Sequence, residues 1–275
     1  MNCVRTLPYL SAWYARYQRD GLVLVGVHSP EFDFEHVRSN VDAATKRLGV
    51  TWPVALDNNM TIWNSFQNNY WPADFVADRD GKIRYNHIGE GGYKETEDVL
   101  RSLLGVDPAS ARAASPGGGD TSDAVASDNV SPETYLGTER GTAGTRPGLI
   151  TYPAVGTLDT GQCRVTGEWL GEDQRVMAGT AGAAIVYAYR ASEVNLVMTP
   201  PKDGAVDVQI DLDGHPLPPA YRTVDTVVEA GGATVVHVDH DGLYRLVLGP
   251  SVEEHTVRVT ARQPDVSAFA FTFGP

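Results

Sequence analysis

The opening stretch Met1-Asn2-Cys3-Val4-Arg5-Thr6-Leu7-Pro8 places a cysteine just ahead of apolar residues that recur at helical spacing. These apolar residues are Leu10, Trp13, Tyr14 and Tyr17. The pattern predicts an amphipathic helix with Cys3 at or near its first turn. Unpaired N–H groups and the positive end of the helix dipole stabilise a thiolate at such a position. The stretch therefore indicates either a reactive redox sulfur or only a small residue near a terminus.

Downstream of this helix, helical and strand patterns alternate up to about residue 105. The strand patterns are Leu22–His28, Pro53–Leu56, Ala73–Ala77 and Lys82–Ile88, and the helical patterns are about 32–48, 62–68 and 93–104. Leu22–His28 is an almost unbroken apolar run, which is typical of a strand buried on both faces. Asp78-Arg79-Asp80-Gly81 predicts the turn of a hairpin. This order predicts an open α/β sheet with right-handed crossovers.

Composition and charge exclude several classes of protein. The chain has 275 residues and a net charge of −13, which argues against nucleic acid as a partner. No apolar run approaches the roughly 20 residues that span a bilayer, and no signal-peptide pattern follows Met1. Two cysteines, Cys3 and Cys163, are too few for a disulfide scaffold or a structural zinc site. We expect Cys163 to be structural and the protein to hold no metal or cofactor.

A change of composition divides the chain into three parts. Residues 1–106 form the α/β domain, and residues 107–148 are rich in Ala, Ser, Gly, Asp, Thr and Pro, which predicts a flexible linker. Within the linker, 131–137 is the exception, because its Tyr and Leu could dock on a neighbouring domain. Residues 149–275 contain short alternating strand patterns separated by turn residues such as Asp213-Gly214 and Asp241-Gly242. They predict a two-sheet sandwich of jelly-roll type.

With this order of elements, the first domain resembles the thioredoxin fold, in particular the redoxin and TlpA-like group. Asn2-Cys3 followed by Leu7-Pro8 is similar to the second half of a C-x-x-C helix start. Leu22–His28 and the helix after it are similar to the parallel strand and crossover of that fold. Trp71-Pro72-Ala73-Asp74-Phe75 lies where the family keeps a cis-proline loop facing the cysteines. The resemblance covers roughly residues 1–105.

The chain resembles most closely the C-terminal part of the DipZ type of thioredoxin-like protein. In that type the motif reads C-[IM]-N-C, and a β-sandwich similar to a carbohydrate-binding module follows the redoxin domain. Tyr70-Trp71-Pro72, the Gly89-Glu90-Gly91 turn with Tyr93, and the Ala268–Gly274 stretch carry the likeness. Against this pattern, no cysteine precedes Met1, and the strand that normally leads into the motif is missing. We therefore expect a truncated chain in which Cys3 is the resolving thiol without its nucleophile.

The resemblance also implies roles for residues around the cysteine. Pro72 is expected to be cis and to hold a backbone segment open for a substrate peptide. Trp71 either shields the sulfur or packs, with packing slightly favoured, while Asn2, Tyr70 and Glu90 are candidate substrate contacts. Glu90 and His87 could relay protons to a dithiol, although a solvated loop is the simpler interpretation. His28 is expected to be a satisfied polar residue at a strand end.

Aromatic side chains of the sandwich are candidates for stacking on sugar rings, because a planar apolar face with a polar edge suits that ligand. The candidates for carbohydrate contact are Trp169, Tyr187 and Tyr189, followed by Tyr221 and Tyr244. Tyr187 and Tyr189 lie two residues apart in a strand pattern and therefore share a face. Strand aromatics are more often core residues, so each could equally be buried.

The resemblance implies a thiol–disulfide oxidoreductase that acts on protein dithiols and disulfides. It further implies an extracytoplasmic setting and an upstream membrane domain that passes electrons. Two alternatives stay open: a thiol peroxidase of the redoxin group, and a non-catalytic protein whose sandwich binds cell-wall glycan. Because the nucleophilic cysteine is missing, we expect weak or no turnover from this chain alone.

Overall fold

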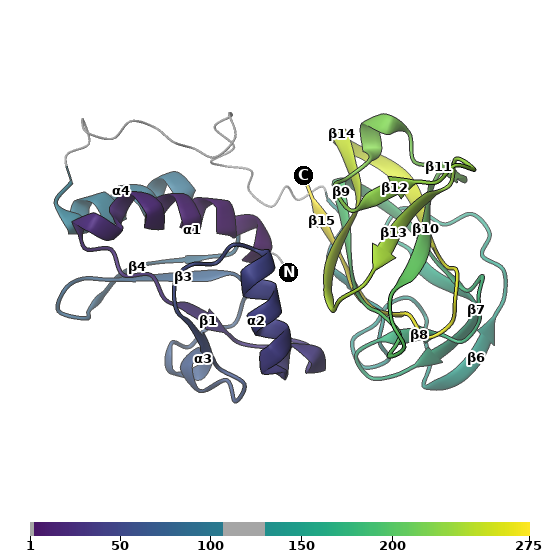
Figure 1. Ribbon diagram of the computed structural model, residues 1–275, viewed down its shortest axis with the longest axis horizontal. Helices are drawn as coiled ribbons and strands as arrows, with labels where there is room; N and C mark the ends of the chain where they lie inside the picture. The colour runs from purple at the N-terminus through teal and green to yellow at the C-terminus, as the bar shows by residue number, and fades with distance from the viewer. Residues whose placement is uncertain (1–2, 107–129) are drawn as a thin grey trace. The chain divides into compact units, whose positions relative to one another are not determined.

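The structure, a computed structural model, describes residues 3–106 and 130–275. The chain divides into two compact units, the first ending at Val125 and the second beginning at Ala126 (Figure 1). No helix in the described ranges is long and apolar enough to cross a membrane.

The first unit has the predicted order of helix, strand, helix, strand, helix, hairpin and helix. Its elements are α1 (Cys3–Tyr17), η1 (Gln18–Asp20), β1 (Gly26–His28), η2 (Asp33–His36), α2 (Arg38–Arg47), β2 (Val54–Leu56), α3 (Thr61–Ser65), β3 (Ala73–Ala77), β4 (Ile83–Ile88) and α4 (Tyr93–Leu104). The predicted bounds of β3 and α4 are confirmed to the residue. Cys3 lies in the first turn of α1, as the helical spacing predicts.

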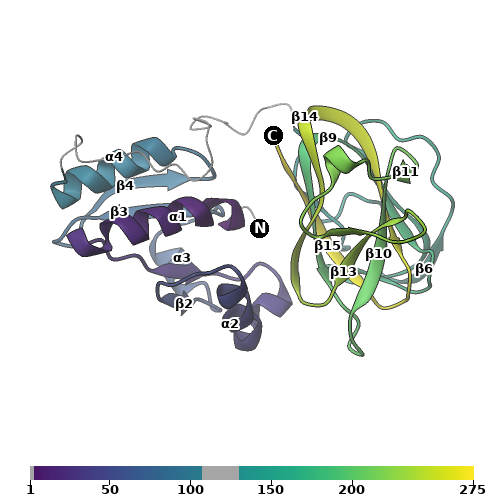
Figure 2. The same ribbon diagram turned by 45° about the horizontal axis from the view of Figure 1, so that its top comes forward.

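Helices α1 and α4 lie along the same side of the β3–β4 hairpin (Figures 1 and 2). Trp13 and Tyr17 of α1 and Leu100 of α4 are buried against each other and against Val76 of β3. The Tyr17 hydroxyl donates a hydrogen bond of 2.5 Å to a carboxylate oxygen of Glu97, which ties the two helices together. This packing fixes α1, and with it Cys3, relative to the hairpin.

The strands of the first unit form two separate pairs. β1 and β2 are parallel, and β3 and β4 are antiparallel. The prediction that Leu22–His28 is a strand buried on both faces is wrong: only Gly26–His28 is paired, and Val23, Val25 and Val27 are exposed. The run is apolar enough for a buried strand, but among the described residues β1 pairs only with β2, along one edge.

Because an unpaired apolar edge is a template for pairing with another chain, we expect the protein to self-associate through residues 23–27. Replacing Val23 and Val25 with lysine places charge along this edge and should shift the equilibrium to monomer in sedimentation velocity. Val224→Lys is the matched control, because Val224 of the second unit is 82% exposed, as is Val23. Unchanged association in the double variant would contradict the assignment of this edge.

The second unit is built around one 11-stranded sheet whose described pairings are all antiparallel. Its elements are β5 (Thr134–Tyr135), β6 (Gly148–Tyr152), β7 (Cys163–Gly171), β8 (Val176–Ala178), β9 (Ala184–Thr199), β10 (Val206–Leu212), β11 (His215–Pro216), η4 (Pro219–Tyr221), β12 (Thr226–Val228), β13 (Thr234–Val238), β14 (Gly242–Ala261) and β15 (Ser267–Gly274). The sheet curves around its own core and gives the expected β-sandwich.

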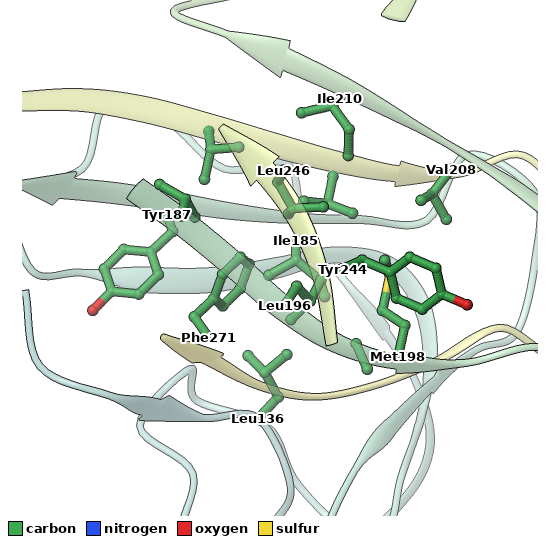
Figure 3. Packing of buried hydrophobic residues seen from close by; sticks show 14 of the residues in the cluster. Leu136, Ile185, Tyr187, Leu196, Met198, Val208, Ile210, Tyr244, Leu246 and Phe271 are labelled. Atoms are coloured by element: carbon green, nitrogen blue, oxygen red, sulfur yellow. The ribbon is translucent and has the colours of Figure 1, made fainter. Parts of the chain in front are cut away.

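Two long strands organise this sandwich. β9 and β14 pair along almost their whole lengths and are longer than the short strands that the sequence pattern predicts. Register shifts, one of them between Leu248 and Glu253, let β14 bend without ending. The inward side chains of these strands meet those of β10 and β15 in one core. Figure 3 shows Tyr187 of β9, Leu246 of β14, Ile210 of β10 and Phe271 of β15 in this core.

The segment 130–148, predicted as the last part of the linker, belongs instead to the second unit. β5 pairs with β15, and Leu136 is fully buried in the sandwich core. The docking expected for 131–137 is therefore present. Glycine is needed here for close approach rather than for flexibility: a Cβ on Gly137 would collide with the backbone oxygen of Asp173. The rest of the predicted linker, 107–129, lies outside the described residues.

Candidate functional site

An ion pair connects the first turn of α1 to the loop that follows β4. The Arg5 guanidinium donates from Nε and Nη2 to the two carboxylate oxygens of Glu90, both at 2.7 Å. The two side chains are less than a third exposed, and this paired geometry is the strong form of an arginine–carboxylate contact. Both oxygens of Glu90, a predicted substrate contact, are thus occupied by Arg5. The pair joins the helix that carries Cys3 to the loop after β4.

A double-mutant cycle measures this contact. Arg5→Ala and Glu90→Ala should each destabilise the first unit by about 1–2 kcal/mol, with a coupling energy of similar size. Lys94 and Asp98 form a matched control pair at 2.8 Å, but their side chains are 73% and 48% exposed. Exposed i,i+4 pairs contribute only about 0.3–0.5 kcal/mol. Equal coupling in the two cycles, measured by chemical denaturation, would contradict the positioning role of Glu90.

The Trp71–Pro72 peptide bond is cis, as predicted. Pro72 is buried, and its carbonyl oxygen accepts a hydrogen bond of 2.8 Å from the backbone N–H of Gly89. Gly89 immediately precedes Glu90, so this hydrogen bond and the Arg5–Glu90 pair bring the proline loop and the start of α1 to the same loop. These contacts support the prediction that Cys3 and Pro72 lie near each other.

The two aromatic residues before Pro72 have different surroundings. The Trp71 indole donates a hydrogen bond of 3.1 Å to the carbonyl of Ser29 and packs on Trp63, with ring centroids 4.2 Å apart. Packing therefore accounts for Trp71. Tyr70 is 64% exposed, which leaves its ring available to a substrate. Asn2, the third predicted contact, lies outside the described residues.

Cys3 is half-buried, and its surroundings disfavour the thiolate. Burial raises the pKa of the Cys3 thiol, and the negative charges of Glu35 and Asp74 raise it further. This direction runs against the thiolate expected at a helix N-terminus, and a reactive sulfur at Cys3 stays a prediction. A thiol that keeps its proton at neutral pH is not an efficient first nucleophile. It can still resolve a mixed disulfide if a base takes its proton.

Two titratable groups beside the proline loop bear on this need for a base. Asp74 of β3 pairs in register with His87 of β4. Burial raises the pKa of the Asp74 carboxyl, and the neighbouring His87 lowers it in part. The His87 ring is half-buried, lies 3.3 Å from the carbonyl oxygen of Glu90, and packs over Gly92. It is therefore not the solvated side chain that the sequence favours.

The remaining polar candidates have local partners. His28 Nε2 lies 3.0 Å from the carbonyl oxygen of Glu35, in agreement with a satisfied strand end. No group of three or more His, Cys, Asp or Glu side chains in the described ranges is placed to hold a metal ion. Cys163 is buried in the sandwich core, and this burial raises the pKa of its thiol to about 12.

The predicted carbohydrate contacts are wrong for the three principal candidates. Trp169, Tyr187 and Tyr189 are all buried in the core of the sandwich. The Trp169 indole donates to the carbonyl of Thr166, and the Tyr187 hydroxyl is 2.7 Å from the Thr134 hydroxyl. Alternation correctly places Tyr187 and Tyr189 on one face, but that face is the interior. Tyr244 is also buried, while Tyr221 is half-buried and donates to Glu253.

Comparison with known proteins agrees with this two-part architecture. Residues 131–274 match the family model described as "Thioredoxin like C-terminal domain". Protein DipZ of Mycobacterium tuberculosis (strain CDC 1551 / Oshkosh) is 29% identical over 287 residues, covering 100% of this chain. The chain spans only 37% of the length of DipZ.

Two further matches cover a smaller share of the chain. Thiol-disulfide oxidoreductase ResA of Geobacillus thermodenitrificans (strain NG80-2) is 26% identical over 106 residues, 38% of this chain and 56% of ResA. A solution structure of a thioredoxin-like protein in the oxidized form is 26% identical over 38% of this chain and 70% of its own, with a TM-score of 0.35. The first unit is thioredoxin-like, and the second is the β-sandwich that follows it. The chain belongs to the family of the thioredoxin-like C-terminal domain and is related to the DipZ type of thioredoxin-like protein.

Proposed function

We propose that this chain is the redox part of a thiol–disulfide oxidoreductase, with Cys3 as the thiol that resolves mixed disulfides. The substrate is a protein disulfide, held as an extended peptide beside Pro72 and Tyr70. In the resolving step the Cys3 sulfur attacks a mixed disulfide between the substrate and a more reactive cysteine. The substrate thiol then leaves, and Cys3 becomes part of a new disulfide.

One observation carries this proposal. Cys3 is the first residue of α1, the Arg5–Glu90 ion pair connects α1 to the loop after β4, and the same loop is hydrogen-bonded to Pro72. The charge of Asp74, two residues beyond Pro72, also acts on the Cys3 thiol. A protonated, half-buried thiol suits resolution better than first attack. The name of the ResA relative, a thiol-disulfide oxidoreductase, agrees with disulfide chemistry of this kind.

The reactive cysteine is proposed to stand two residues before Asn2, as in the C-[IM]-N-C motif of the DipZ type. We also propose an extracytoplasmic location and electron supply from a membrane domain of the longer protein. These assignments follow from the resemblance to DipZ, of which this chain spans about a third.

A trapping experiment tests the proposal. A variant with one cysteine added directly before Met1 restores Cys-Met-Asn-Cys, and Cys3→Ser in that background removes the resolving thiol. The double variant should accumulate a mixed disulfide with a protein substrate that contains a disulfide bond. This covalent complex is visible on a non-reducing gel. The variant that retains Cys3 should release it. Equal accumulation in both would show that Cys3 does not resolve the intermediate.

The same variants separate the alternative activity. A thiol peroxidase would consume hydrogen peroxide through the added cysteine without forming protein mixed disulfides. Peroxide turnover in the absence of trapped substrate would therefore overturn the proposal. For glycan binding, the three principal aromatic candidates are buried, so no observation favours it.

A further inference from the structure

Asp57 is a buried aspartate that connects two segments of the first unit. It directly follows β2, and Ser29 directly follows β1, so the two residues meet at the same end of this parallel pair. Asp57 is only 4% exposed, and its Oδ2 atom accepts hydrogen bonds from the Ser29 hydroxyl at 3.3 Å and from the backbone N–H of Trp63 at 2.8 Å. Its Oδ1 atom accepts from the backbone N–H of Ile62 at 2.9 Å. The carboxylate therefore fixes the start of α3 against the end of β1.

Both segments that Asp57 connects hold the side chain of Trp71. The Trp71 indole donates a hydrogen bond of 3.1 Å to the Ser29 carbonyl, and its ring packs on the Trp63 ring at a centroid distance of 4.2 Å. The two residues that donate to Asp57 Oδ2 are thus the same two that hold the indole. Asp57 therefore acts on Trp71 through Ser29 and Trp63.

The surroundings of Asp57 keep its carboxyl group ionised. Burial by itself raises the pKa of this carboxyl, but the N–H groups at the start of α3 and the Ser29 hydroxyl lower it by more, so that the pKa lies below its ordinary value. An ionised carboxylate offers only acceptors, which suits a site where the neighbours are donors. An amide at this position would place an NH2 group where one of the two acceptor oxygens stands.

We propose that Asp57 is a positioning residue, which holds Trp71 in place and thereby fixes the loop on which an extended disulfide substrate docks. The inference rests on the proposed function, in which Tyr70 and Pro72 meet the substrate peptide. Trp71 lies between these two residues in the chain, so a displacement of its indole displaces both. Small errors of position at a binding loop are costly, even when they originate far from the reacting atoms.

The first test follows the indole N–H signal of Trp71 by NMR in the chain as it stands, with Trp71→Phe to assign it. In Asp57→Asn, whichever way the amide turns, one N–H group at the start of α3 faces an NH2 group. The Trp71 signal should therefore shift, and its exchange with water should become faster. Ser29→Ala removes the hydroxyl but keeps the carbonyl that accepts from Trp71, so it should shift the signal in the same direction by less. The effects of the two variants should not add, because both act on one network.

The second test measures insulin reduction by the Cys-Met-Asn-Cys variant with and without Asp57→Asn. The KM for insulin should rise about 3- to 10-fold with little change in kcat, a factor that corresponds to the loss of about one hydrogen bond. A misplaced docking loop weakens binding of the substrate and of the transition state alike, which raises KM only. A purely structural role would instead reduce the fraction of active molecules, and would lower kcat at an unchanged KM.

Asp78→Asn is the matched control for both tests. The Asp78 carboxylate also accepts from two backbone N–H groups, those of Asp80 and Lys82, and these contacts likewise lower its pKa. It lies in the turn between β3 and β4 and not beside Trp71 in the chain. The control should leave the Trp71 signal and the KM unchanged. Should Asp57→Asn fail to fold, Ser29→Ala carries both tests, with smaller effects in the same directions.

A Trp71 signal that is the same in Asp57→Asn and in the wild type overturns the inference, and so does an unchanged KM beside a shifted signal. Equal effects of Asp57→Asn and Asp78→Asn also overturn it, because they report a general loss of stability. The proposed function fails separately, if no mixed disulfide is trapped in the Cys-Met-Asn-Cys background. In that case the Trp71 signal, which needs no turnover, still decides whether Asp57 holds the loop.

Discussion

Replacing Trp169 with alanine is expected to lower the free energy of unfolding of the second unit by about 3–5 kcal/mol. The indole is 2% exposed, lies in the core of the sandwich, and donates to the carbonyl of Thr166 at 3.0 Å. Its removal leaves a cavity between strands that pair on both sides of β7 and cannot collapse freely. Chemical denaturation of the full chain, followed by circular dichroism, measures the loss.

Leu149→Ala is the control for this substitution, because Leu149 lies on the neighbouring strand β6 and is 60% exposed. It should change stability by less than about 0.5 kcal/mol. A Trp169→Ala variant as stable as the wild type would mean that the ring is a surface group. Such a result would restore it as a candidate for sugar stacking.

Replacing Gly92 with alanine is expected to destabilise the first unit by about 2–4 kcal/mol. One part of this cost is the left-handed backbone conformation, and the other is a steric clash with His87. Gly92 has φ of 59°, and a Cβ there would stand 2.5 Å from Cε1 and 2.7 Å from Nδ1 of His87. The imidazole would have to leave its position beside the Glu90 carbonyl.

Gly91→Ala separates the two sources. Gly91 also has a positive φ, of 90°, but a Cβ there would meet nothing within 4 Å. Its cost should be limited to the backbone, about 1–2 kcal/mol. Combining Gly92→Ala with His87→Ala should recover the steric part of the loss. If Gly91→Ala and Gly92→Ala lower the free energy of unfolding equally, and His87→Ala restores none of it, the clash with His87 does not contribute to the cost.

Local patterns predict the elements of the first unit well. The helix Tyr93–Leu104 is flanked by Gly92 and Gly105, both at positive φ, and has inward residues at helical spacing. The hairpin turn at Asp78–Gly81 is equally explicit. The run Leu22–His28 has strand composition, but composition cannot reveal that within residues 3–106 its strand is paired along one edge. Val23 and Val25 are exposed for that reason.

Sequence patterns fail where long-range pairing decides. Gly249-Pro250 has the composition of a turn, yet β14 continues through it because a register shift absorbs the irregularity. Gly137 and Gly141 suggest a linker, although both are in close contact with backbone. Trp169, Tyr187 and Tyr189 illustrate the same limit, since alternation defines a shared face but not which face is inside.

The candidate site is predicted in part. Cys3 and Pro72 follow from motifs, while the Arg5–Glu90 pair joins residues 85 positions apart and has no local signal. The register shift between Val76 and Ala77 places His87 opposite Asp74; without it Asn86 would be there.

The reduction of insulin disulfides with dithiothreitol tests the central claim most directly, that Cys3 works opposite the cis-proline loop as the second thiol of a pair. The variant with Cys-Met-Asn-Cys should accelerate insulin precipitation, while its Cys3→Ser form and the chain without the added cysteine should not. Turnover that persists after Cys3→Ser, or no turnover with both cysteines present, would contradict the account.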